Sequence, residues 1–358
     1  MGIVFGKLVK GLEKEIFPRV VKRKITENNQ NPLKKSRRLD PIHCDNESPS
    51  TSGDTSKLHD HVLETRNTPE EALSKRSANR NAVADDGPVE TKKRTLDMFQ
   101  ARYEEQEKLG EGGFGCVFAG HRKADNLNVA IKHIRQEDVF KHRDNTGKQI
   151  PMEVAVMLKL AGETERPSAP IDLLDWYDLD QELILVLERP MPAVDLHDYI
   201  KAKGGYLMEK DAKVILRQVV DAAIDLQQRH IFHRDIKVNN LLIETSNKKA
   251  PRVRIIDFGV SCFSAEGDAF RNFEGTHFPP EWHSQHEYKA GPTTVYQIGG
   301  VLYDMLHQQS FGQENLYQQR RINWRFSENC RDFFKSCFQT DPDRRLTLQQ
   351  LRNHLWLR

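Results

Sequence analysis

The sequence predicts an α+β protein made of two lobes, with a disordered tail in front of them. Residues 98–188 alternate short β-branched runs with glycine-rich turns, which predicts a small antiparallel β-sheet carrying one helix. Residues 193–357 carry apolar side chains at helical spacing, most clearly over 212–230 and 293–306, which predicts a larger helical lobe. The proline-containing segment 188–192 is the predicted hinge between the lobes. The composition, 37% hydrophobic and 30% charged, suits a globular protein with some disordered sequence.

The N-terminal segment differs from the rest in composition. Residues 1–20 place apolar side chains at helical spacing with lysines between them. This predicts an amphipathic helix that docks on protein or, as an alternative, touches a membrane surface. Residues 21–97 are rich in polar and charged residues and poor in aromatic ones, so disorder is expected. Basic clusters at 22–24 and 34–38 resemble a bipartite nuclear-import signal, with solvated charge as the alternative. The predicted location is therefore the cytoplasm, with the nucleus as a second location.

Composition also argues against several other classes of protein. No apolar run approaches the roughly 20 residues that cross a bilayer, so no membrane span is expected. The five cysteines are scattered without paired spacing, which argues against a zinc site and favours reduced thiols. No nucleic-acid partner is expected, and the predicted oligomeric state is a monomer.

The segment 233–240, His-Arg-Asp-Ile-Lys-Val-Asn-Asn, gives the most direct prediction of chemistry. Its spacing matches the catalytic loop of protein kinases, in which one short loop carries a proton acceptor and a metal ligand. In that interpretation Asp235 accepts the proton of a substrate hydroxyl, and Asn240 helps to hold Mg²⁺ against the nucleotide phosphates. Lys237 would place positive charge beside the transferred phosphoryl group. The alternative is a chance match in a surface turn, and the neighbouring motifs decide between the two.

A glycine-rich loop of the form Gly-x-Gly-x-x-Gly-x-Val lies upstream. Its glycines allow backbone to approach phosphates with no side chain between them. A predicted strand follows the loop instead of a helix, which favours a kinase loop over a dinucleotide-binding turn. The loop residues expected to contact the nucleotide are Leu109, Gly110, Gly112, Gly113, Gly115 and Val117.

Ionisable residues of the same predicted site lie on both sides of the catalytic loop. Lys132 ends the run Val-Ala-Ile-Lys and is expected to bind the nucleotide phosphates, held by Glu153 from a helix. That helix is expected to bury an apolar stripe formed by Val154, Met157, Leu158 and Ala161. Asp257, in Ile-Asp-Phe-Gly, is a predicted Mg²⁺ ligand. Arg345 is the expected buried partner of Glu281.

Together these motifs resemble a protein-kinase catalytic domain covering 98–357. The resemblance implies ATP and Mg²⁺ as cofactors, and proteins with a serine or threonine acceptor as substrates. The apolar slot for adenine would consist of Leu109, Val117, Ala130, Leu187, Leu242 and Ile256. The Glu188 carbonyl is the expected hinge contact, because Pro190 occupies the usual donor position and has no N–H.

The hinge Glu-Arg-Pro-Met-Pro at 188–192 and the string Pro-Pro-Glu-Trp at 279–282 are similar to the Pim family of serine/threonine kinases. The resemblance implies a constitutively active kinase that prefers substrates with upstream Arg or Lys. Val238 and Asn239 stand where the family has two acidic residues, so this preference is expected to be weakened. Asp195, which matches another family carboxylate with the same purpose, is retained.

An active enzyme is favoured over a pseudokinase that acts as a binding module through its folded surface and basic tail. The residues whose loss usually marks a pseudokinase are all present: Lys132, Glu153, Asp235, Asn240 and Asp257. Lys237, two residues after Asp235, favours Ser/Thr over tyrosine as the acceptor.

Other expectations concern the support of the loop. Glu266, Asp268 or Glu274 is expected to supply the negative charge that Arg234 needs without phosphorylation. Thr276 is expected to contact Asp235 and Lys237. Thr294 stands where most kinases place an aspartate that anchors the catalytic loop.

Overall fold

The structure is a computed structural model that describes residues 88–113, 115–144, 146–161, 169–246, 251–308, 310–311 and 325–358. All of these residues belong to one unit of the chain, Asp85–Arg358. The predicted amphipathic helix at 1–20, the basic clusters and most of the predicted disordered tail lie outside the described residues. The predictions made for them, including the location in the cell, stay predictions.

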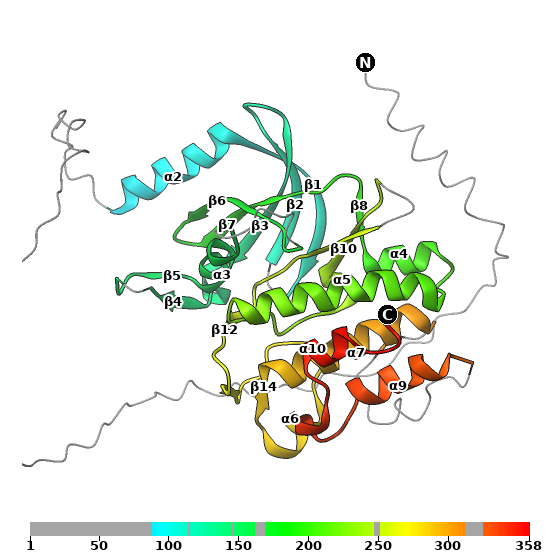
Figure 1. Cartoon of the computed structure of the whole chain (residues 1–358). Coiled ribbons are helices and arrows are strands. Elements are labelled where there is room, and N and C mark those ends of the chain that lie inside the picture. Colours follow the sequence, from blue (N-terminus) through cyan, green and yellow to red (C-terminus); the bar gives the residue numbers. More distant parts are fainter. Residues whose placement is uncertain are drawn as a thin grey trace, which may run out of the picture. The chain divides into compact units, whose positions relative to one another are not determined.

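The small lobe is a five-stranded antiparallel sheet in the order β1-β2-β3-β7-β6 (Figure 1). Its strands are β1 (Tyr103–Gly112), β2 (Gly115–Arg122), β3 (Leu127–Arg135), β6 (Leu173–Asp178) and β7 (Glu182–Glu188). Between β3 and β6 come a short 3₁₀ turn, a hairpin and one helix: η1 (Gln136–Asp138), β4 (Lys141–Arg143), β5 (Gln149–Pro151) and α3 (Met152–Ala161). The predicted small lobe, an antiparallel sheet with one helix, is confirmed.

Helix α3 is largely buried, but not with all of the predicted residues. Leu158 is 50% exposed and Ala161 is also exposed, so these two predictions are wrong. The buried residues are Glu153, Val154, Ala155, Val156, Met157 and Leu160. The helix contacts β4, β5 and β6 of the small lobe and β12 of the large lobe, so its first half is buried almost all round, and the exposed residues lie in its second half.

A further helix, α2 (Pro88–Arg102), precedes the sheet, so ordered structure begins earlier than the boundary predicted at 98. Phe99 and Tyr103 are buried in a cluster with residues of β3, β6 and β7. The Arg102 guanidinium pairs with Asp175 at 2.7 Å. The sequence prediction missed this helix because few apolar residues are set among many polar and charged ones.

The large lobe is mainly helical, as predicted (Figure 1). Its helices are α4 (Leu196–Ala202), α5 (Glu209–Gln228), α6 (Pro280–Gln285), α7 (Ala290–Leu306), α9 (Glu328–Cys337) and α10 (Leu348–Arg352), with 3₁₀ turns η2 (Val238–Asn240) and η4 (Pro342–Arg344). Helices α5 and α7 pack together at its centre, and α7 is buried continuously from Thr293 to Leu306. Among the described residues, no helix is long and apolar enough to span a membrane.

Short strands connect these helices and carry the segments of the predicted site. They form three small sheets: β8 (Ala193–Asp195) with β10 (Leu241–Glu244) and β11 (Arg252–Ile255), β9 (Ile231–Phe232) with β12 (Cys262–Phe263), and β13 (Ala269–Phe270) with β14 (Tyr288–Lys289). The predicted buried pair is present: Arg345 Nη1 lies 2.7 Å from Glu281 Oε1, and its other terminal nitrogen pairs with Oε2. This pair fixes α6 to the segment that follows η4.

Candidate active site

The predicted catalytic loop leaves β9 and enters η2, and its central carboxylate is tightly held. Asp235 is 2% exposed. Its Oδ1 accepts hydrogen bonds from the Thr276 N–H at 3.0 Å and the Thr276 hydroxyl at 2.8 Å, a contact that the sequence predicted. Its Oδ2 lies 2.7 Å from the Lys237 ammonium and accepts from the Asn240 amide at 3.1 Å. Both oxygens are therefore fixed in direction.

The same contacts determine the charge of Asp235. Burial alone would raise the pKa of its carboxyl, but the bonds from Lys237 and Thr276 outweigh it and lower that pKa below its ordinary value. Asp235 is therefore ionised at neutral pH, which is the state that a proton acceptor requires. His233, beside it, is buried, and burial lowers the pKa of its imidazole, so it stays neutral.

Lys132 brings the two lobes together at this site. Its ammonium lies 2.8 and 3.0 Å from the Glu153 carboxylate oxygens on α3, the contact that the sequence predicted, and 2.8 Å from Asp257 Oδ1. Burial would lower the pKa of Lys132, but the two carboxylates outweigh it and raise the pKa, so the ammonium stays charged. A charge from within β3 is thereby fixed between the helix of the small lobe and a loop of the large lobe.

Asn240 and Asp257 supply the oxygen ligands that suit Mg²⁺, which binds few protein carboxylates and takes its other ligands from phosphates and water. The two residues are neighbours, because the Ile256 N–H donates to the Asn240 carbonyl at 3.0 Å. Burial would raise the pKa of Asp257, but Lys132 outweighs it and lowers that pKa, so the carboxylate is charged. These residues fit the predicted metal ion.

The residues predicted for the adenine slot come from both lobes. Strand pairing places Ala130 opposite Leu187, and Val117 opposite Lys132, so β2, β3 and β7 present them side by side. The large lobe contributes Leu242 from β10 and Ile256 from the end of β11. Leu187 is 6% exposed, whereas Leu109 is 47% exposed. Leu109 therefore lies at the mouth of the slot.

The glycines of the predicted phosphate loop divide into two kinds. A β-carbon at Gly110, Gly112 or Gly113 would meet nothing within 4 Å, so these positions leave open space above the site. At Gly115 a β-carbon would lie 1.9 Å from the His133 carbonyl oxygen, and φ is +121°. Gly115 is therefore required by the fold of the β1–β2 hairpin.

The hinge contains a buried charge network that the sequence prediction missed. The Arg254 guanidinium, 4% exposed, pairs with the Glu188 carboxylate at 2.8 and 2.5 Å and with Glu244 at 3.1 Å. The predicted contact with adenine uses the backbone of Glu188, so its side chain is available to join β7 to β10 and β11. One of the two arginines in the short strand β11 was the only signal for this network in the sequence.

The expected acidic partner of Arg234 is not found among Glu266, Asp268 and Glu274. Within the described residues the Arg234 guanidinium makes no ion pair. It lies over the Phe270 ring, with 4.9 Å to the ring centroid, and near the Phe232 ring at 6.0 Å. The sequence prediction was wrong because it considered only charge as a partner for this cation, whereas ring faces also attract cations.

The surface beside the catalytic loop explains one of the two departures from the Pim pattern. Val238 is 5% exposed and belongs to the core, so this position offers no group to a substrate. Asn239 is exposed. Asp195 accepts from the Asp198 N–H at 2.8 Å and so caps α4, which packs against η2. Asp195 and Asn239 therefore lie on neighbouring elements.

Comparison with known proteins agrees with this geometry. The protein kinase domain family matches residues 103–357. The chain is similar to serine/threonine-protein kinase pim-2 of Danio rerio, with 35% identity over 73% of this chain and 86% of the relative. It is also similar to serine/threonine-protein kinase prk-2 of Caenorhabditis elegans, with 29% identity over 74% of this chain and 60% of the relative. The chain therefore belongs to the protein kinase family, as a divergent relative of the Pim serine/threonine kinases.

Proposed function

We propose that this kinase transfers the γ-phosphoryl group of ATP to serine and threonine hydroxyls of proteins, in the presence of Mg²⁺. The observation that carries the proposal is the ionised carboxylate of Asp235, which Thr276 contacts at one oxygen and Lys237 at the other. The hydrogen-bonded contacts among Lys132, Glu153 and Asp257 support it, because they fix a charged ammonium beside a predicted metal ligand. The pseudokinase alternative is not favoured, because none of these groups is missing or displaced.

Each residue then has a defined task. Asp235 accepts the proton of the substrate hydroxyl, whose oxygen forms the new bond to phosphorus while the bond to the ADP oxygen breaks. Lys237, 2.7 Å from Asp235, places positive charge beside the phosphoryl oxygens. Lys132 binds the phosphates of the nucleotide. Asn240 and Asp257 would hold Mg²⁺, which would supply positive charge to neutralise the phosphates.

We infer further that the segment between Gly259 and Pro279, the activation segment, needs no phosphate. A phosphate in this segment would pair with the Arg234 guanidinium. Here that guanidinium lies over the ring of Phe270 in β13. Phe270 in turn contacts the Tyr288 ring at 5.7 Å, and the Tyr288 hydroxyl donates to the Asn272 carbonyl at 2.6 Å. The segment is therefore held by rings and backbone bonds that the chain itself supplies.

The first test replaces Asp235 by Asn, which keeps an acceptor for Thr276 but removes the base. Loss of a general base typically lowers turnover about 10²–10⁴-fold. The rate of transfer to a Ser/Thr peptide should fall by such a factor while ATP affinity stays close to wild type. A variant with wild-type kcat would show that Asp235 is not the base.

The second test concerns substrate choice, for which we propose a weak preference for upstream arginine that depends on Asp195. The Asp195→Asn variant is the sharper choice, because it keeps an oxygen to cap α4 and removes only the charge. In this variant, kcat/KM for peptides with upstream arginine should become equal to kcat/KM for peptides without it. Asn239→Glu should raise that ratio up to about tenfold at low salt, because charge-assisted hydrogen bonds are stronger than neutral ones, and less so at high salt.

Strong multi-arginine selectivity in the wild-type enzyme, unaffected by Asp195→Asn, would contradict this proposal. It would show that other carboxylates line the groove. The outcome is independent of the first test, which concerns the chemical step alone.

A further inference from the structure

Gln297 is a polar side chain in the middle of the mainly apolar helix α7. It is 0% exposed. A buried amide is stable only when its donors and acceptors find partners. Gln297 finds them on the catalytic loop: its Nε2 donates to the Arg234 carbonyl, and its Oε1 accepts from the Ile236 N–H at 3.3 Å. One side chain thus binds the backbone on both sides of Asp235.

The backbone that Gln297 binds is in an unfavourable conformation. Arg234 has φ of +69°, a left-handed value that residues other than glycine rarely adopt and that surrounding contacts must maintain. Its carbonyl is also closely packed by Gly275, where a β-carbon would lie 2.4 Å from the oxygen. The Arg234 carbonyl is therefore confined between Gln297 and Gly275, which directly precedes the Asp235 partner Thr276.

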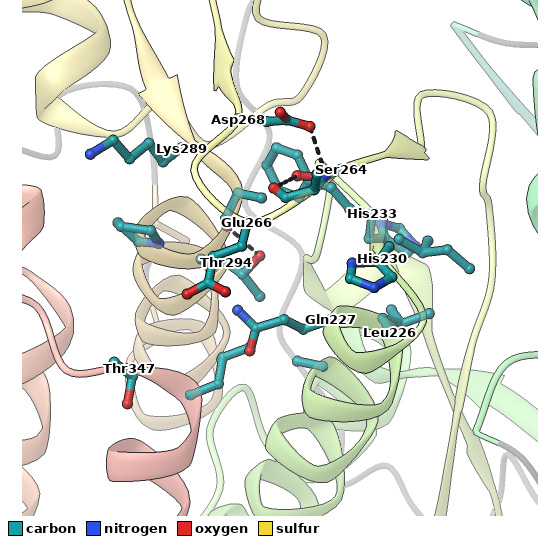
Figure 2. A pocket seen from close by; sticks show the side chains of 18 of the residues that line it. Leu226, Gln227, His230, His233, Ser264, Glu266, Asp268, Lys289, Thr294 and Thr347 are labelled. Carbon is teal, nitrogen blue, oxygen red and sulfur yellow. Dashed lines mark hydrogen bonds between the residues drawn. The ribbon is translucent and has the colours of Figure 1, made fainter. Parts of the chain in front are cut away.

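The first turn of α7 gives the loop no comparable support. Thr294 lines a cavity of about 480 Å³ behind the loop, together with Gln227, His230 and Ile236. Figure 2 shows Thr294 on α7 and Gln227 on α5 around this cavity. The Thr294 hydroxyl donates to the Ala290 carbonyl of its own helix at 2.8 Å. Among the described residues of α7, only the Gln297 side chain hydrogen-bonds to the loop.

We propose that Gln297 is a positioning residue for phosphoryl transfer, because it fixes the two peptide groups that flank the base. The inference rests on the proposed role of Asp235. Gln297 touches neither substrate nor nucleotide, so its loss affects turnover and leaves nucleotide binding alone. An error of about 1 Å in the placement of a reacting group can lower a rate about 100-fold.

The test compares Gln297→Met with Thr294→Val. Methionine keeps the length of the side chain and removes both hydrogen bonds; valine at 294 removes a hydroxyl on the cavity side of the same helix that bonds only to that helix. We expect Gln297→Met to lower kcat about 10- to 100-fold, with the KM for ATP within about twofold of wild type. Thr294→Val should retain wild-type kcat. Rates are referred to the concentration of nucleotide-binding sites, so that unfolded protein does not count.

A third variant distinguishes an effect of the lost hydrogen bonds from an effect of altered packing. It also provides a test if Gln297→Met does not fold. In Gln297→Glu, a protonated carboxyl supplies one donor and one acceptor, as the amide does here, whereas the ionised form has no donor. Burial raises the pKa of such a carboxyl. The kcat of this variant relative to wild type should therefore rise as the pH is lowered from about 8 to 6.

Two results would overturn the inference: wild-type kcat in Gln297→Met, or a relative kcat of Gln297→Glu that does not change with pH. Asp235→Asn, assayed in parallel, shows which idea has failed. If Asp235→Asn loses turnover and the Gln297 variants do not, only the role of Gln297 is wrong. If Asp235→Asn also keeps turnover, the proposed function itself is wrong.

Discussion

The two loops that meet at the active site are built in opposite ways. In the glycine-rich loop of the small lobe, residues 109–113 are exposed, and β1–β2 pairing holds the loop. In the catalytic loop of the large lobe, His233, Asp235, Ile236 and Asn240 are all buried, and side chains from η2, α7 and the segment before α6 hold it. The nucleotide loop is open to solvent, whereas the central residues of the catalytic loop are buried and hydrogen-bonded.

This difference separates the two tasks of the site. A nucleotide must enter and leave, so its loop needs open space and little packing. A base must keep its direction through every turnover, so its loop needs many contacts that do not depend on the nucleotide. Changes in the first loop should therefore affect KM, and changes in the second should affect kcat and stability.

The strongest test of this comparison is a pair of glycine replacements. Gly275→Ala places a methyl group 2.4 Å from the Arg234 carbonyl oxygen, so the catalytic loop must shift. Overpacking typically costs about 1–3 kcal/mol, and we expect a lower Tm together with a kcat reduced at least tenfold. Gly112→Ala meets nothing within 4 Å and should keep the wild-type Tm and raise only the KM for ATP. Equal effects of both variants on Tm would show that the two loops do not differ in how tightly they are packed.

A smaller effect is expected at the hinge. Pro190→Ala supplies the N–H that proline lacks, and one net hydrogen bond contributes about 0.5–1.5 kcal/mol. The KM for ATP should fall a few-fold while kcat stays unchanged. Met191→Ala is the matched control, because this neighbouring side chain is 57% exposed and no backbone donor is gained. An unchanged KM in Pro190→Ala would mean that the hinge backbone does not face adenine.

The smallest expected effect on activity concerns a buried carboxylate that makes no ion pair within the described residues. Asp304 is 9% exposed, and burial raises its pKa to about 6, although the Phe311 N–H donates to it at 2.5 Å. The folded state thus keeps a proton that the unfolded chain releases, so stability falls as the pH rises from about 4 to 6 and stays reduced above that.

Asp304→Asn removes this penalty and keeps an acceptor for Phe311. It should stabilise the fold by about 1–2 kcal/mol at pH 7.5, less at pH 5, with kcat unaffected. Urea unfolding at both pH values measures the difference. A gain that is equal at both pH values would show that the carboxyl of Asp304 is not titrating in this range.

Sequence patterns predicted the groups that do chemistry better than the groups that hold them. The contact between Lys132 and Glu153 could be predicted because a fixed motif spacing is tied to one reaction. The contact of Arg254 with Glu188 and that of Gln297 with the catalytic loop could not, because these partners lie more than 60 positions away in the chain and a polar residue outside any motif gives only a weak signal. The ring contacts of Arg234 were missed for a related reason, since phenylalanine is common in every core.

Helix α2 has a consequence for anyone who produces this protein in shortened form. The family match begins at Tyr103, but the Phe99 ring stacks on the Tyr103 ring at 6.0 Å and covers part of the sheet. A chain begun at the family boundary would leave Val129, Ile131 and Val186 without this cover. Exposed apolar patches promote self-association. A shortened chain should therefore begin before Pro88 if it is to stay dispersed at the concentrations that crystallisation requires.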